Sequence, residues 1–131
     1  LAHGSLQNPV WEYVLDAYTA LHSFSLLETE VALVGHTHLP LMFAEDAASK
    51  QIKRGLVRAG AQLKLSARMI LNPGSVGQPR DHDPRASFAI LDPEKMTWRI
   101  RRVEYDISSV QERIRQAGLP EKHALRLAEG W

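Results

Sequence analysis

A short apolar run that ends in a glycine and two histidines constrains the fold of this chain more than any other feature. Residues 31–34 read Val-Ala-Leu-Val, which is typical of a short strand buried in a parallel sheet. Gly35 ends the run, and His36 and His38 follow it. Open α/β sheets place ligand sites just past the carboxyl ends of their strands, so the histidine pair lies where such a site is expected. The alternative is two ordinary polar residues in a loop.

The spacing of the two histidines predicts how their side chains would lie. In an extended backbone, residues two apart point to the same side, with their Cα atoms about 6.5–7 Å apart. Two imidazoles placed in this way could bind one metal ion together, or one ion each of a close pair. Neutral imidazole is a suitable ligand for manganese, zinc, nickel or iron(II).

Three further motifs accompany Gly35-His36-Thr37-His38 in a fixed order. They are His3-Gly4-Ser5 with Pro9 and Trp11-Glu12-Tyr13, the loop from Asn72 to Asp81, and Arg102–Asp106 followed by Ala117–Pro120. Together they resemble the C-terminal half of the calcineurin-like metallophosphoesterases, in particular the compact bacterial and archaeal phosphodiesterase branch. The resemblance covers nearly the whole chain.

This resemblance implies an α/β fold, a layered sandwich of two mixed β-sheets flanked by helices. The first three motifs of the family (Asp-x-His, Gly-Asp and Gly-Asn-His) are not found in the sequence. We therefore expect residues 1–131 to be a single domain that supplies the second half of a metallophosphoesterase domain. Its N-terminal half would be absent from this sequence, as part of a protein nearly twice as long.

The resemblance also implies a dinuclear metal site. His3 and His36 would bind the second metal and His38 the first. The carboxylate ligands and the histidine that protonates the leaving group would come from the missing half, so we assign no catalytic residue here. The complete protein would then be a metal-dependent phosphohydrolase, in which metal-bound hydroxide attacks a phosphomonoester or a phosphodiester. This chain alone would carry only part of the active site. For His3, the alternative is a frayed terminal residue with no role.

The loop after Leu71 contributes four further candidates for substrate binding or for support of the metal ligands: Asn72, Gly74, Ser75 and Arg80. Successive amides near Gly74 could face an anion, and the planar guanidinium of Arg80 could bind a phosphate. The alternatives are a tight turn that needs proline and glycine, and ordinary ion pairs between Arg80 and Asp81 or Asp83. We interpret His82 as a solvated loop residue.

The composition of the chain limits the kinds of partner that it is expected to bind. The chain has 131 residues, 44% of them hydrophobic, enough for one core. Its 16 basic and 15 acidic residues give a net charge of +1, which argues against nucleic acid as a partner. There is no cysteine and no apolar run near the roughly 20 residues that span a bilayer, so we expect no membrane and a cytoplasmic location. The sequence leaves open the substrate, the metal and whether the protein forms a homo-oligomer.

Two other functions remain as alternatives. A non-catalytic interaction scaffold could use the same fold, although a scaffold has no use for three histidines at the metal positions. A nuclease would need a basic channel that this near-neutral composition does not indicate. We interpret Arg99, Arg101 and Arg102 as the solvated face of a sheet.

Periodicity and turn residues predict the remaining elements. We expect a helix capped by Asn8 that runs to about Ser23, and a hairpin or surface excursion between Glu45 and Gly60. Strands are expected over residues 31–34, 41–44, 61–65, 68–71, 86–91 and 97–105. A tight turn would join the strands at 61–65 and 68–71, and the last two strands would form a hairpin around residues 92–95. A change of phase predicts a bulge near Arg101 and Arg102. Two C-terminal helices are expected, one from the cap Asp106 to Gly118 and one from Pro120 to near Gly130.

Overall fold

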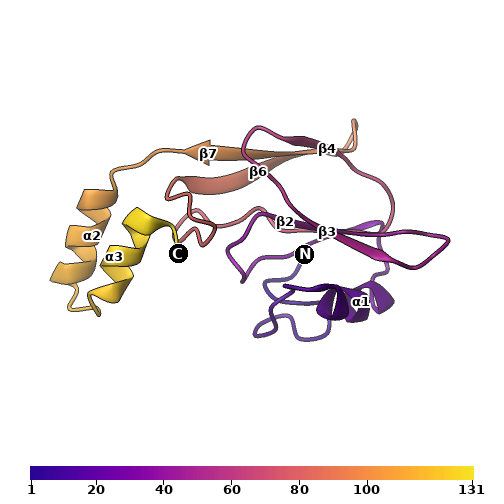
Figure 1. Cartoon of the computed structure of the whole chain (residues 1–131), viewed down its shortest axis with the longest axis horizontal. Coiled ribbons are helices and arrows are strands. Elements are labelled where there is room, and N and C mark those ends of the chain that lie inside the picture. The colour runs from indigo at the N-terminus through magenta and orange to yellow at the C-terminus, as the bar shows by residue number, and fades with distance from the viewer.

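The computed structural model describes residues 1–131 and contains three helices and seven strands (Figure 1). None of the helices is long and apolar enough to cross a membrane. In chain order the elements are α1 (Ala17–Ser25), β1 (Val31–Leu33), β2 (Leu41–Glu45), β3 (Ile52–Leu56), β4 (Gln62–Lys64), β5 (Met69–Leu71), β6 (Ala86–Asp92), β7 (Thr97–Val103), α2 (Ile107–Gln116) and α3 (Lys122–Glu129).

The strands form two sheets. The first has the order β1-β5-β2-β3, in which β1 and β5 run parallel and the other neighbours antiparallel. The second has the order β4-β7-β6 and is antiparallel. The predicted parallel strand at residues 31–34 and the α/β fold with two layered sheets are confirmed. The expected excursion after Glu45 contains β3, which pairs with β2 as a hairpin.

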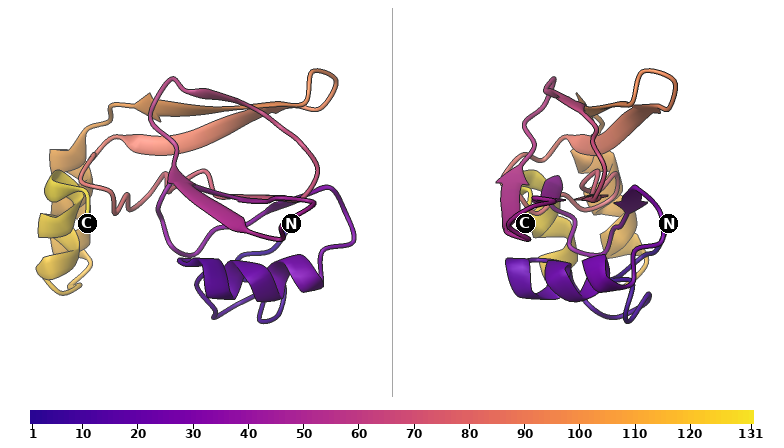
Figure 2. Two further views of the ribbon diagram at one scale, coloured as in Figure 1. Left: turned by 45° about the vertical axis from the view of Figure 1, so that its right-hand side comes forward. Right: turned by 90° about the vertical axis from the view of Figure 1, so that its right-hand side faces the viewer.

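The layers follow one another as α1, the first sheet and then the second sheet, with the α2–α3 hairpin at one end (Figures 1 and 2). The central strand β5 is buried along its whole length because both of its faces are covered. Ile70 packs with residues of α1 and β2, whereas Met69 and Leu71 pack with Trp98 and Ile100 of the second sheet. Burial of each such side chain contributes about 1.5–3 kcal/mol.

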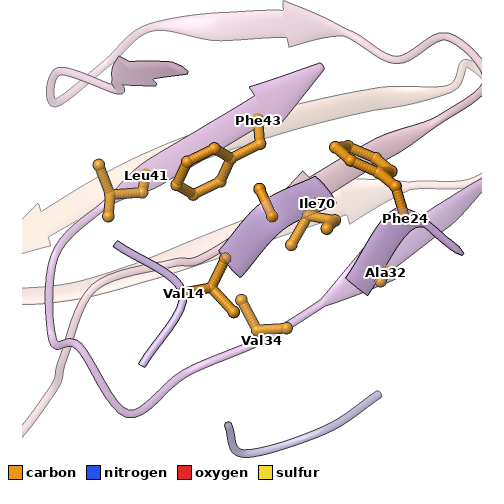
Figure 3. Close-up of a cluster of buried hydrophobic side chains, with 8 residues drawn as sticks. Val14, Phe24, Ala32, Val34, Leu41, Phe43 and Ile70 are labelled. Carbon is orange, nitrogen blue, oxygen red and sulfur yellow. The ribbon is translucent and has the colours of Figure 1, made fainter. Parts of the chain in front are cut away.

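The core beneath α1 brings together residues far apart in the sequence (Figure 3). Phe24 of the helix lies against the face formed by Ala32, Leu41, Phe43 and Ile70. Arg68, just before β5, holds the end of the helix to the sheet. It donates to the carbonyl oxygens of Phe24 and Leu27 and to the carboxylate of Glu45.

The first helix begins later than its sequence predicts. Asn8 does not cap a helix: its side chain accepts only a local bond from Trp11. The amides of Gly4 and Ser5 bond instead to the carbonyl oxygens of Pro9 and Glu12, which closes residues 4–12 into a loop. The helix starts at Ala17, where Asp16 and Thr19 form a capping box.

Two predictions in the region of the second sheet are also wrong. β4 and β5 exist, but the segment between them crosses from one sheet to the other. The β6–β7 hairpin is confirmed, but its register runs without interruption, so there is no bulge near Arg101 and Arg102. The phase of the apolar side chains changes because Arg102 occupies an inward position and Val103 an exposed one.

The C-terminal helices agree with the sequence. The Asp106 carboxylate accepts from the amide of Ser109 and caps α2, and Gly118 follows the end of that helix with a φ of 67°. α3 ends at Gly130, whose φ of 68° is left-handed.

Candidate metal centre

His36 and His38 lie in the loop that leaves β1. Both have a left-handed backbone, with φ of 62° and 61°. The extended geometry expected for this pair is therefore wrong. A left-handed conformation is uncommon for any residue except glycine, and such residues cluster at functional sites. Here the loop turns sharply between the end of β1 and the start of β2 at Leu41.

His3 reaches the same place from the start of the chain. The amide of Ala2 donates to the carbonyl oxygen of Leu33 (3.0 Å), and the amide of Gly35 donates to that of His3 (2.9 Å). Residues 1–3 therefore run beside the end of β1. The result is direct contact between two rings, since Nε2 of His3 lies 2.9 Å from Nδ1 of His36.

Tyr13 holds the ring of His36 from the other side. The two rings stack with their centroids 4.0 Å apart and their planes at 11°. Such a contact contributes about 0.5–1.5 kcal/mol and restricts the orientation of the imidazole. Ser5, which is fully buried, donates to the carboxylate of Glu12 and so fixes the loop that carries Tyr13. Tyr13 belongs to the motif that begins at His3, but its contact with His36 was not predicted, because that contact exists only after the loop closes.

The ring of His38 is oriented by the main chain. Its Nδ1 lies 2.7 Å from the carbonyl oxygen of Gln78. A carbonyl oxygen can only accept, so Nδ1 carries the proton and the lone pair of Nε2 remains available for a metal ion. Burial lowers the pKa of His38, and the nearby charges of Arg80, His36 and His3 lower it further, against the opposing effect of the Gln78 bond. The ring is therefore neutral near pH 7, as a metal ligand must be.

Asn72 joins the two loops. It is fully buried at the end of β5, and its amide donates to the carbonyl oxygen of Gly35 (2.6 Å) and to the hydroxyl of Thr37 (2.9 Å). Its own oxygen accepts from the amide of Gly74 at 3.0 Å. Asn72 thus holds the backbone that carries His36 and His38.

The other loop candidates lie nearby with partners of their own. The Gly74 amide is taken by Asn72, so it does not face an open anion site. The hydroxyl of Ser75 accepts from the amide of Gln78, whereas Arg80 donates to the side-chain oxygen of Gln78. His82 is exposed, and its backbone amide bonds to Gly130. Its side chain makes no contact with the three histidines.

Arg102 overturns the expectation of a solvated arginine face. Arg99 and Arg101 are exposed, but the side chain of Arg102 is only 3% exposed and forms an ion pair with Asp81. It also donates to the carbonyl oxygens of Asp83 and Arg85. The sequence pattern did not show this, because a strand with an arginine at an inward-facing position has the same alternation of polar and apolar residues as a strand with a bulge.

The donors present fit part of a metal site. The 2.9 Å between the nitrogen atoms of His3 and His36 is close to the separation of about 3.3 Å expected for two nitrogens on one tetrahedral zinc ion. No group of three or more histidine, cysteine, aspartate or glutamate side chains in this chain could hold a metal ion. These residues therefore fit as a partial ligand set that needs further ligands.

Comparison with known proteins identifies the family of this chain. The sequence profile of the calcineurin-like phosphoesterase superfamily domain matches residues 1–96. The chain belongs to this superfamily. The matched range includes all three histidines and the loop that carries Asn72. Members are metal-dependent phosphoesterases, so the histidines lie in a phosphoesterase fold.

Individual relatives support the same assignment. The chain is similar to the crystal structure of a metallophosphoesterase from Sphaerobacter thermophilus, with 45% identity and a TM-score of 0.93, over 99% of this chain and 54% of that one. It is 33% identical to an uncharacterised protein of Methanocaldococcus jannaschii, over 98% of this chain and 50% of the relative. A hypothetical protein of Pyrococcus horikoshii shares the fold, with a TM-score of 0.71 and 23% identity, over 99% of this chain and 45% of that one. The chain spans about half the length of these relatives.

Proposed function

We propose that the protein containing this chain is a phosphohydrolase that cleaves phosphomonoesters or phosphodiesters at a site with two divalent metal ions. The observation that supports this most directly is the contact between His3 and His36, 2.9 Å apart at their nitrogen atoms and 33 residues apart in the sequence. Direct contact between two histidine rings from distant parts of a chain is not expected of ordinary surface histidines. The superfamily match gives the contact a chemical meaning.

Each of the three histidines has a distinct part in this proposal. His3 and His36 would hold one ion between them, and His38 would bind the other through Nε2. A close pair of divalent ions (manganese, zinc, nickel or iron) polarises the phosphoryl oxygens, lowers the pKa of a water and stabilises the leaving oxygen. Neighbouring residues of the protein orient two of the imidazoles for this purpose. Tyr13 stacks on His36, and the carbonyl oxygen of Gln78 accepts the Nδ1 proton of His38.

Arg80 is the residue of this chain that we propose for substrate contact. Its guanidinium is partly exposed and bonds to the side-chain oxygen of Gln78, two residues away. It is close enough to His38 for its charge to lower the pKa of that ring. A planar guanidinium at this position could bind two phosphate oxygens. Asn72, Gly74 and Ser75 would support the histidine loops instead of contacting phosphate, because their polar groups already have partners.

We propose that the remaining ligands come from a segment that precedes this chain in the full-length protein. The relatives are about twice as long as the chain, which agrees with this arrangement. A cavity of about 410 Å³ opens beside His3, lined mainly by apolar groups that include Leu33, Pro73 and Trp98. The indole N–H of Trp98 is buried there without a hydrogen-bond partner. This surface has the character of an interior face that another part of the domain would cover.

Hydrolysis assays on the full-length protein test the proposal. We expect turnover of an aryl phosphomonoester or an aryl phosphodiester with manganese, loss of turnover after chelation, and recovery when the metal is restored. The ratio of the two activities would define the substrate class. Manganese-loaded protein without activity on either ester would contradict the proposal and favour an interaction scaffold. Cleavage of DNA or RNA under the same conditions would identify a nuclease.

A further inference from the structure

Arg102 is a buried cation outside the histidine cluster, near the end of a strand that has no part in the proposed chemistry. It lies on β7, where its side chain is 3% exposed. Its guanidinium pairs with the carboxylate of Asp81 and donates to the carbonyl oxygens of Asp83 (3.1 Å) and Arg85 (2.9 Å). A buried arginine with three partners on one loop fixes the position of that loop.

The same loop carries the carbonyl oxygen that orients His38. Gln78, whose carbonyl oxygen lies 2.7 Å from Nδ1 of His38, is three residues before Asp81. Pro79, between them, is fully buried, and its ring restricts the backbone. A short, packed segment therefore connects the Arg102 ion pair to the hydrogen bond on the proposed ligand.

The carboxylate of Asp81 depends on Arg102. One of its oxygens pairs with the guanidinium, and the other is buried without any hydrogen-bond partner. An unpaired buried carboxylate is costly, so loss of Arg102 would drive Asp81 to move towards water. Movement of Asp81 would shift the segment that ends at Gln78.

We infer that Arg102 is a positioning residue for His38, acting through Asp81 and the carbonyl oxygen of Gln78. This inference rests on the proposed function, since it assumes that His38 binds one of two metal ions. Groups that orient a ligating histidine typically change metal affinity by about 10–100-fold. The effect is confined to the metal bound by His38, because His3 and His36 are held separately, by the start of the chain and by Tyr13.

The test compares two metal affinities in the full-length protein. Manganese is titrated into metal-free wild type and into Arg102→Lys, Asp81→Asn and Arg101→Lys variants, with bound metal measured directly. A His38→Ala variant identifies which of the two affinities belongs to His38. Arg101→Lys is the matched control, since it makes the same change one residue away on the exposed face of β7.

We expect Arg102→Lys and Asp81→Asn to lower the affinity for the metal bound by His38 by at least tenfold. The affinity for the other metal should stay within about threefold of the wild-type value. Arg101→Lys should change neither. Equal weakening of both metals, or no weakening of either, would overturn the inference. If Arg102→Lys does not fold, the isosteric Asp81→Asn decides in the same way. Wild-type protein that binds no metal would refute the proposed function itself, a result distinct from unequal effects on two measured affinities.

Discussion

The side chain of Asn72 crosses from the end of β5 to the main chain of Gly35, to whose carbonyl oxygen its amide donates over 2.6 Å. The same amide donates to the Thr37 hydroxyl, between the two histidines. The third hydrogen bond of this buried side chain is to its own loop, since its oxygen accepts from the amide of Gly74. One residue therefore fixes the relation between the histidine loop and the loop that orients His38.

Asn72→Asp in the full-length protein tests this arrangement. The aspartate has the same shape but cannot donate to Gly35, and it places a charge in a fully buried position. We expect a loss of about 2–4 kcal/mol in the free energy of unfolding, measured by denaturant titration. Asn8→Asp is the matched control, because Asn8 is exposed and uses only its acceptor oxygen. Equal stability of the two variants would contradict the role given to Asn72.

The sequence predicted the elements that depend on local signals. The run at residues 31–34 indicated β1, and the turn at residues 92–95 indicated the β6–β7 hairpin. The caps at Asp106 and Gly118 indicated α2. In each case the hydrophobic pattern and the turn or cap residues agree, so tertiary contacts do not change the outcome.

The features that could not be predicted from the sequence depend on contacts between residues far apart in the chain. Asn8 and Pro9 are typical of the start of a helix, but the hydrogen bonds between Ser5 and Glu12 close that segment into a loop. The contacts of Tyr13 with His36 and of the Gln78 carbonyl oxygen with His38 join loops that are far apart in the chain. A main-chain acceptor can come from any residue type, so no sequence pattern identifies it. The proximity of His3 to His36 was expected from the family resemblance and not from spacing.

Removal of either loop histidine should abolish metal binding at its own site. We expect His36→Ala and His38→Ala in the full-length protein to lower turnover by at least about a hundredfold, with loss of bound metal and a folded structure. His82→Ala is a matched control, because His82 has the same left-handed backbone, with φ of 63°, but is exposed and takes no part in the hydrogen bonds and ring contacts of the three histidines. The cost of alanine in that conformation is therefore common to all three. Unchanged metal content in either loop variant would exclude that histidine as a ligand.

Acid should weaken the attachment of α1 to the first sheet. The hydrogen bond from Arg68 lowers the pKa of Glu45 below its ordinary value of 4.5, with burial opposing and the charges of Arg68 and Lys50 assisting. The unfolded chain therefore takes up a proton at higher pH than the folded chain does. The stability gained from the pair is complete above about pH 4.5 and is lost as the pH falls through the folded pKa.

Glu45→Gln separates this effect from general acid denaturation. We expect the variant to be less stable than wild type at pH 7 by about 2 kcal/mol, below the full cost of breaking a buried pair because Arg68 is partly exposed. The difference should shrink as the pH falls from 5 through the lowered pKa of Glu45 in the folded chain. Denaturant titrations of the full-length protein at several pH values measure it. A difference that stays constant across that range would show that the charge on Glu45 does not contribute.

Gly74→Ala should disturb the loop that orients His38. The backbone of Gly74 is left-handed, with φ of 83°, and an added Cβ would lie 2.7 Å from the hydroxyl oxygen of Ser87. That hydroxyl already donates to the carbonyl oxygen of Pro73, so it cannot move without loss of a bond. We expect a loss of about 2–4 kcal/mol, from strain and overpacking together. Gly77→Ala is the control, since an added Cβ there meets nothing within 4 Å.

A second variant separates the effect of backbone strain from that of overpacking. In Gly74→Ala with Ser87→Gly, the steric contact is gone but the left-handed backbone remains, so we expect about 1–2 kcal/mol of the Gly74→Ala loss to persist relative to Ser87→Gly alone. Thermal or denaturant unfolding of the full-length variants measures both steps. Complete recovery in the double variant would mean that only the contact with Ser87 requires glycine. If Gly74→Ala is as stable as Gly77→Ala, this close approach of the loop to β6 does not exist.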